Sequence, residues 1–197
     1  RQILNKLGNN SEPEDKASSL DLNKIITGIN KVFSASIPEE KAITIELDLD
    51  PKLPFILGKE NSLKQILINL LKNAAEACVE NGAIKVETRS NLNMNQVNYV
   101  MINIIDNGPG ITESIMQNLF MPGNTSKDDS HTGSGLAVVK NFVEELGGII
   151  SCQSDQRGTT FALLLPRPEG SPLPKSNDDV DNVNTSDSES KVYDFKR

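Results

Sequence analysis

The chain has 197 residues, of which 37% are hydrophobic, and this size and composition suit one globular domain with flexible ends. Its formal net charge of −7 excludes a general nucleic-acid binder, because phosphate backbones are held by clustered lysine and arginine. No apolar run approaches the ~20 residues that cross a bilayer, so we expect a soluble, cytoplasmic piece of a longer protein, beginning here at Arg1 rather than at Met.

Three parts of the chain differ in composition. Residues 1–19 pass from a short apolar pattern to polar residues, which is typical of the end of an upstream helix followed by a linker. Residues 20–166 carry the periodic apolar patterns of a folded domain. Residues 167–197 are rich in Pro, Ser, Asn and Asp and cannot bury enough apolar surface to become ordered, so we predict a disordered acidic tail.

Apolar spacing within the domain alternates between helical and extended patterns. It predicts helices over 20–36, 61–79, 113–119 and 135–146. It predicts strands over 42–49, 84–88, 97–105, 149–154 and 159–165. Between the second and third strands, residues 90–96 (SNLNMNQ) are expected to form a polar loop, and another long polar loop runs to residue 134. This order predicts an α+β sandwich, in which helices cover one face of a mixed sheet.

Two asparagines interrupt the longest predicted helix. Asn69 and Asn73 are four residues apart, so both amides project from the same side. Asparagine is a mediocre helix former, so helix propensity does not explain two asparagines at these positions. An amide oxygen is a ligand that Mg²⁺ accepts beside phosphates and water. The residues alone leave open that both amides simply bond neighbouring backbone.

A glycine-rich turn, DNGPGI (106–111), follows the apolar third strand. Asp106 is an acceptor-only carboxylate when ionised and could receive a hydrogen bond from an exocyclic amine such as adenine N6. Gly108 and Gly110 lack a Cβ and would allow backbone to approach a flat ring closely. A plain turn explains the same residues equally well when they are considered in isolation.

A second glycine motif, Gly133-Ser134-Gly135-Leu136, opens the fourth predicted helix. Free N–H groups and the positive end of the helix dipole favour phosphate at such a position. Upstream, Lys127 adds a cation in a polar loop that is long enough to act as a lid. Glycine before a helix is common, and Lys127 alone is equally consistent with a solvated surface charge.

The order of these motifs resembles that of the GHKL ATPases, and within them the sensor histidine kinases. Residues 69–77 (NLLKNAAEA) are similar to the asparagine box, and 106–111 to the first glycine box. Residues 119–122 (LFMP), 133–136 (GSGL) and 158–161 (GTTF) resemble the phenylalanine box and the two later glycine boxes. The resemblance covers about residues 20–166 and implies a Bergerat-type two-layer sandwich with a mainly antiparallel sheet.

The resemblance implies a site for ATP and Mg²⁺, with residues 122–134 as its lid. Asn73 would ligate the metal and share the catalytic role with Lys127, while Asp106 would hold adenine N6. The nucleotide would be bound by these three residues and by the other matched positions, Asn69, Gly108, Gly110, Gly133, Ser134, Gly135, Leu136 and Thr159.

The same resemblance implies a function. The domain would transfer the ATP γ-phosphoryl group to a histidine on a separate dimerisation domain, for relay to a response regulator receiver domain. It implies a bacterial source, a homodimer in the intact protein, no nucleic-acid partner and no direct membrane contact by this fragment, although the intact protein can be membrane-anchored. A serine kinase of the anti-sigma-factor type and a non-catalytic ATP-binding module stay open as alternatives.

Three positions depart from the family pattern. His131 stands where many relatives have glycine, Ser134 where many have leucine, and Lys59 where aspartate often precedes the asparagine helix. His131 is the only histidine and lies in the predicted lid, so we do not expect it to be the phosphoacceptor. The departures should alter the mobility of the lid and the affinity for nucleotide while the main positions are kept.

Overall fold

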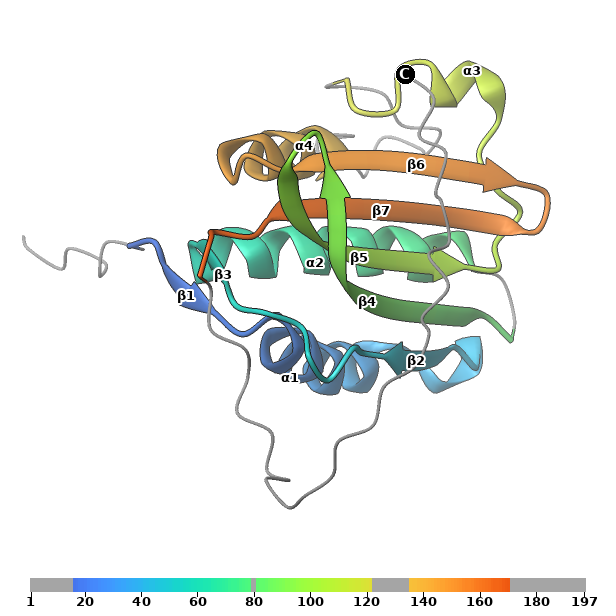
Figure 1. The fold of residues 1–197 in the computed structure, drawn as a ribbon. Coiled ribbons are helices and arrows are strands. Elements are labelled where there is room, and N and C mark those ends of the chain that lie inside the picture. Colours follow the sequence, from blue (N-terminus) through green and yellow to red (C-terminus); the bar gives the residue numbers. More distant parts are fainter. Residues whose placement is uncertain (1–15, 79–80, 122–134, 171–197) are drawn as a thin grey trace, which may run out of the picture.

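A mixed sheet with helices on one face forms the domain (Figure 1). The computed structural model describes residues 16–78, 81–121 and 135–170, without the side chain of Asn91. The helices are α1 (Leu22–Ser36), α2 (Glu60–Ala77), α3 (Glu113–Met116) and α4 (Gly135–Glu145), with a 3₁₀ turn η1 (Glu39–Lys41). The strands are β1 (Ser18–Leu20), β2 (Thr44–Asp48), β3 (Ile56–Gly58), β4 (Ala83–Met94), β5 (Val97–Asp106), β6 (Ile149–Asp155) and β7 (Gly158–Pro166). The predicted α+β class is therefore confirmed.

The main sheet has the strand order β2-β4-β5-β7-β6. Strand β2 runs parallel to β4, and the other neighbouring pairs are antiparallel. The parallel pair needs a long crossover connection, which α2 supplies. The register places Asp106 opposite both Ile84 of β4 and Thr159 of β7. Residues far apart in the sequence thus meet at the end of the sheet where β5 ends and β7 begins.

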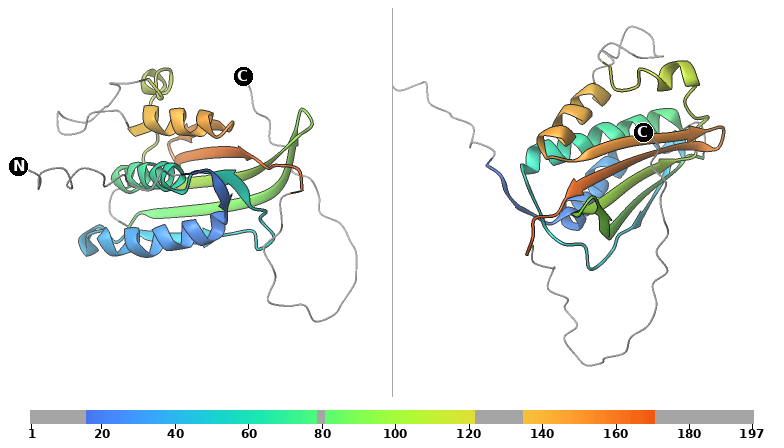
Figure 2. Two further views of the ribbon diagram at one scale, coloured as in Figure 1. Left: turned by 90° about the vertical axis from the view of Figure 1, so that its left-hand side faces the viewer. Right: turned by 45° about the horizontal axis from the view of Figure 1, so that its top comes forward.

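Helix α2 lies in the middle of the helical layer, between α1 and α4 (Figure 2). Its apolar stripe faces the sheet and consists of Leu63, Ile66, Leu67, Leu70, Leu71, Ala74 and Ala75, all buried. Burial of the five Leu and Ile side chains contributes on the order of 10 kcal/mol before the entropy of folding is subtracted. This stripe holds α2 firmly, and the polar side of the helix is free to carry the two asparagines.

The predicted loop over 90–96 is wrong for most of its length. Strand β4 continues to Met94, and a two-residue turn at Asn95 and Gln96 joins it to β5. Both turn residues have positive φ, 50° and 67°, as the tight turns of hairpins require. The register shifts between Arg89 and Leu92, so a bulge bends the hairpin, and its far end leaves the plane of the sheet on the side opposite the helices (Figure 2). The side chains of this exposed hairpin are mostly polar, so the sequence shows no apolar alternation that would indicate a strand.

Two short strands were not predicted. Strand β1 pairs antiparallel with β3, and Leu20 is buried in the core. The folded domain therefore includes residues 18 and 19, which the sequence pattern placed in the linker. A strand of three residues is too short for alternation to be recognised.

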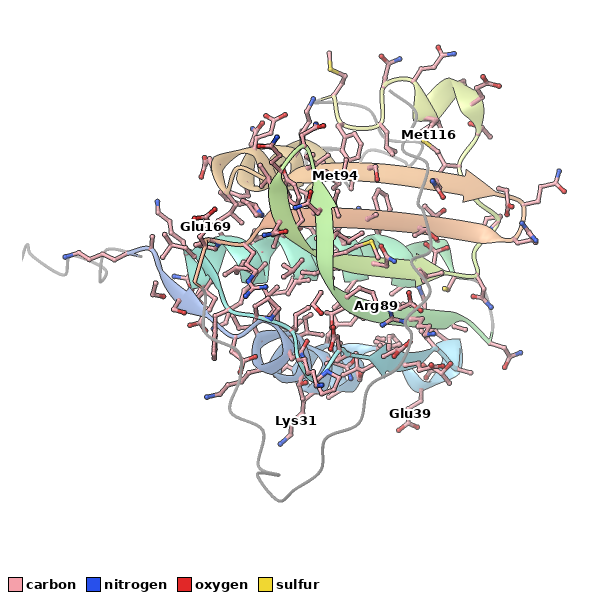
Figure 3. All side chains as sticks on the ribbon, viewed as in Figure 1. Lys31, Glu39, Arg89, Met94, Met116 and Glu169 are labelled. Atoms are coloured by element: carbon pink, nitrogen blue, oxygen red, sulfur yellow. The ribbon has the colours of Figure 1, made fainter. Side chains whose placement is uncertain are left out.

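Charged residues occupy the face of the sheet that the helices leave uncovered. Lys85 lies 3.2 Å from Asp48 and 2.8 Å from Glu87, and Arg89, labelled in Figure 3, lies 2.7 Å from Asp48. Hydrogen bonding to Arg89, and then to Lys85, holds the pKa of Asp48 below its ordinary value. Such exposed pairs contribute little to stability.

None of the described helices combines the length and the hydropathy of a transmembrane span.

Candidate functional site

One face of α2 carries Asn69, Asn73 and Ala77 at successive four-residue steps. At one end of this row, a Cβ at Gly135, the first residue of α4, would lie 4.0 Å from the Asn69 amide. At the other end, a Cβ at Gly108 would lie 3.1 Å from Ala77. Asn73 therefore lies between the start of α4 and the glycine-rich loop.

Both asparagine amides are half-buried and keep hydrogen-bonding capacity. The Asn69 oxygen accepts a long bond of 3.4 Å from the Gln65 amide. Among the described residues, neither Asn69 nor Asn73 bonds the neighbouring backbone, which was the alternative left open by the sequence. Within the described part of the chain no group donates to the Asn73 amide oxygen. An amide oxygen is a ligand that Mg²⁺ accepts, so the residue fits a metal ligand.

Asp106 ends β5 with a buried carboxylate that is only 4% exposed. Its Oδ1 accepts the backbone N–H of Gly108 at 2.9 Å. Burial raises the pKa of Asp106, and the backbone N–H groups of Gly108 and Thr159 oppose that shift. Thr159 lies directly opposite on β7 and is equally buried. A carboxylate has about four acceptor positions, so these bonds leave room for another donor.

Gly110 of the first glycine motif and Gly158 of the last one are both required by contacts within the protein. A Cβ at Gly110, where φ is +80°, would lie 2.0 Å from the carbonyl oxygen of Asp155. A Cβ at Gly158, with φ +143°, would lie 1.9 Å from the carbonyl oxygen of Asp106. The glycine-rich loop and the β6–β7 turn therefore interlock through backbone contacts. The sequence suggested approach to a flat ligand as the reason for Gly108 and Gly110, whereas the contact with Asp155 gives Gly110 a reason without any ligand.

Ser154 and Asn107 also hold this loop, and neither was a predicted site residue. The Ser154 hydroxyl accepts the N–H of Ile111 at 2.8 Å, and it lies 2.9 Å from the Thr159 hydroxyl. The Asn107 side chain accepts the N–H of Ala83 at 2.8 Å and so ties the loop to the start of β4. A serine in a strand gives no sequence signal, because the loop residue that it holds, Ile111, is 43 residues away. Asn107 was visible only as part of an Asn-Gly turn.

The remaining predicted site residues divide between described and undescribed parts of the chain. Gly135 begins α4, and Leu136 packs against the core beside it. The whole predicted lid (122–134), with Lys127, His131, Gly133 and Ser134, lies outside the described residues. A hollow of about 380 Å³ at the end of the sheet is lined by residues of β5, β6, β7 and the β6–β7 turn, among them Asp106, Ser154 and Thr159, and not by the described residues of α2 or α4.

The buried Asp106 acceptor, the Asn73 amide and the N-terminus of α4 form a donor and acceptor set that fits an adenine nucleotide with its metal. The carboxylate suits an amine, the amide oxygen suits Mg²⁺, and the free N–H groups of a helix start suit phosphate.

Cys78 and Cys152 lie near Asp106, but burial raises the pKa of both thiols, that of Cys152 to about 12. Neither thiol is therefore a nucleophile at neutral pH.

Comparison with known proteins identifies the family of the chain. The family described as histidine kinase-, DNA gyrase B- and HSP90-like ATPase matches residues 58–169, more than half of the chain. The C4-dicarboxylate transport sensor protein DctB of Rhizobium meliloti (strain 1021) is 42% identical over 125 residues, which cover 62% of this chain and 19% of that protein. The sensor histidine kinase ZraS of Klebsiella oxytoca is 36% identical over 152 residues, which cover 77% of this chain and 32% of that protein. The chain thus spans a fifth to a third of these curated relatives.

Solved structures give the same result. The nucleotide-free catalytic domain of histidine kinase ThkA matches with a TM-score of 0.67 and 27% identity, over 77% of this chain and 96% of that domain. A structure of ThkA in complex with the response regulator protein TrrA matches with a TM-score of 0.62 and 26% identity, over 77% of this chain and 42% of that one. The chain therefore belongs to the histidine kinase-, DNA gyrase B- and HSP90-like ATPase family, with sensor histidine kinases among its relatives.

Proposed function

We propose that this domain binds Mg-ATP and transfers the γ-phosphoryl group to a histidine on a separate dimerisation and phosphoacceptor domain. The observation that carries the proposal is the buried Asp106 carboxylate, which lies opposite Thr159 and close to the asparagine face of α2. Relatives that are sensor histidine kinases support the same reaction. The phosphoryl group would then pass to a receiver domain of a response regulator.

Each side chain would have a limited task. Asp106 accepts the adenine N6 amine, with Thr159 beside it, and the interlocked glycine loop keeps both in place. Asn73 would hold Mg²⁺, which neutralises charge on the phosphates during transfer. Asn69 and the first N–H groups of α4 at Gly135 and Leu136 lie where the phosphate chain would pass.

The contributions of Lys127, Gly133 and Ser134 to phosphate binding belong to the same proposal and rest on the order of the motifs alone. So do a homodimeric intact protein and a cytoplasmic location in a bacterium. The bacterial sources of the relatives support the last point. The ThkA structure with a response regulator supports that class of partner.

Labelled ATP tests the transfer directly. The domain alone, a phosphoacceptor hairpin from a sensor kinase alone, and the two together are incubated with it. We expect acid-labile label on the hairpin only when the domain is present, since separation of the two lowers the effective concentration without removing the chemistry. Acid-stable label on serine would favour an anti-sigma-factor-type kinase, and ATP binding without transfer would favour a non-catalytic module. Label on the domain that disappears in His131→Ala would identify a different acceptor.

Calorimetry tests the site. Asn73→Ala should abolish the magnesium dependence of ATP binding, while Asn30→Ala, an amide on α1 away from the site, should not. ATP should bind roughly tenfold or more tightly than GTP, because guanine would leave buried groups unpaired at a cost of about 1–3 kcal/mol. Asp106→Asn should lose most of this preference. Equal discrimination by Asp106→Asn and the wild type would place the base contact elsewhere.

A further inference from the structure

Helix α1 has two apolar stripes; the core buries one of them and covers only the Ile25 end of the other. Leu22, Ile26 and Ile29 are buried toward the sheet. Ile25 and Val32 lie on an adjacent stripe, and Val32 is 71% exposed. A helix that packs by one face in a two-layer domain does not need the second stripe.

The second stripe lines a groove between α1 and α2, which lie side by side (Figure 2). Ile68 of α2, 41% exposed, supplies apolar surface on the opposite wall, and the polar rim includes Lys24, Glu60 and Lys64. The groove encloses about 1010 Å³, which is large enough for several side chains of a docked segment.

Gly28 lies in the middle of α1 and also lines this groove. Glycine inside a helix costs about 1 kcal/mol relative to alanine. A Cβ at Gly28 would meet no atom within 4 Å, so no contact among the described residues demands the missing side chain. An open notch in an apolar groove allows the backbone or a bulky side chain of another segment to approach closely.

We propose that this groove receives the N-terminal segment of the same chain, residues 1–8 (RQILNKLG), with Ile3, Leu4 and Leu7 in contact with the second stripe of α1. These three residues have the spacing of one helix face. The described chain begins beside the groove, since Ser18 and Ser19 of β1 line it.

The residues between Leu7 and Ser18 form a tether that can reach the groove and still keeps the docked segment at a high effective concentration. Eleven steps separate Leu7 from Ser18, a reach of at most about 40 Å. A flexible tether of this length gives an effective concentration on the order of millimolar, so a weak apolar contact suffices. The proposal is independent of nucleotide binding, because none of the groove residues belongs to the candidate site.

Disulfide trapping in the full chain tests it. Leu4→Cys is combined with Val32→Cys in the groove, or with Ile149→Cys as a control. Ile149 is an exposed apolar residue, 43% accessible, on the uncovered face of the sheet. Variants with Leu4→Cys, Val32→Cys or Ile149→Cys alone correct for the native Cys78 and Cys152. We expect the groove pair to form an intramolecular disulfide roughly tenfold or more faster than the control pair. Equal rates would overturn the proposal.

A second pair of variants tests the notch. Gly28→Leu should fill it and slow cross-linking of the groove pair severalfold, whereas Gly28→Ala should leave the rate nearly unchanged. Both should keep the fold, because the position is open and both residues favour helix. Light scattering shows whether cross-linked species are single chains. Concentration-dependent dimers linked through Val32→Cys would assign the groove to a second copy and overturn docking of the chain's own segment.

Discussion

Ser154→Ala tests how the base-binding end of the sheet is positioned. The Ser154 hydroxyl accepts the Ile111 N–H at 2.8 Å and lies 3.1 Å from the Gly158 carbonyl oxygen, to which it donates. A hydroxyl has one proton, so the Thr159 hydroxyl, 2.9 Å away, must be the donor in their shared bond. One side chain thereby fixes the glycine-rich loop and the residue beside Asp106.

The magnitude follows from these bonds. Removal of the hydroxyl leaves a partly buried N–H and a buried threonine hydroxyl without their partner, at a cost of about 1–2 kcal/mol. In a domain of this size the melting temperature should fall by about 2–8 °C. If nucleotide binding must reorder the loop, the same free energy lowers ATP affinity by roughly 5- to 30-fold.

Calorimetric titration with ATP and thermal unfolding are measured on Ser154→Ala, Ser154→Thr and Ser151→Ala. Ser154→Thr keeps the hydroxyl and should recover most of the affinity. Ser151 lies on the opposite side of the same strand, so Ser151→Ala should bind ATP like the wild type. Wild-type ATP affinity in Ser154→Ala, together with a lowered melting temperature, would refute the positioning role and leave only a structural one.

Three further predictions concern other single residues. Lys59 precedes α2 without a side-chain cap, so Lys59→Asp should raise the free energy of unfolding by about 1 kcal/mol in urea titrations, and no gain over Lys59→Ala would contradict this. Gly110→Ala should destabilise the domain far more than Gly170→Ala, because both positions have positive φ but only Gly110 faces a backbone oxygen; similar losses in thermal unfolding would show that φ alone matters. The pKa of Asp106 is raised in the folded state, so ionisation of this carboxyl opposes folding. Its contribution to the free energy of unfolding therefore falls as the pH rises from the unfolded pKa of ~3.9 toward the folded pKa. Asp106→Asn should therefore be more stable than the wild type at neutral pH, and a wild-type advantage that grows with pH would contradict the sign.

The helices and most strands could be predicted because their apolar spacing is local. The α2 stripe and the alternation of Ile45 and Leu47 in β2 follow directly from side-chain periods of 3.6 and 2. The far half of β4 was missed because its polar side chains lie on a hairpin that leaves the sheet, where pairing with β5 and not burial defines the strand. The pair β1–β3 was missed because three residues carry no period.

The sequence alone determined which residues we propose to carry chemistry, since the amides of Asn69 and Asn73 share one helix face by spacing, and Asp106 ends an apolar strand before two glycines. Only the tertiary structure decided what surrounds them. The register of β5 with β7 buries Asp106 against Thr159, and that burial raises the pKa of the carboxyl. The Ser154 bond to Ile111 and the contact of Gly110 with Asp155 join segments more than 40 residues apart. Such contacts depend on how strands pair in space, and no local pattern of residues encodes them.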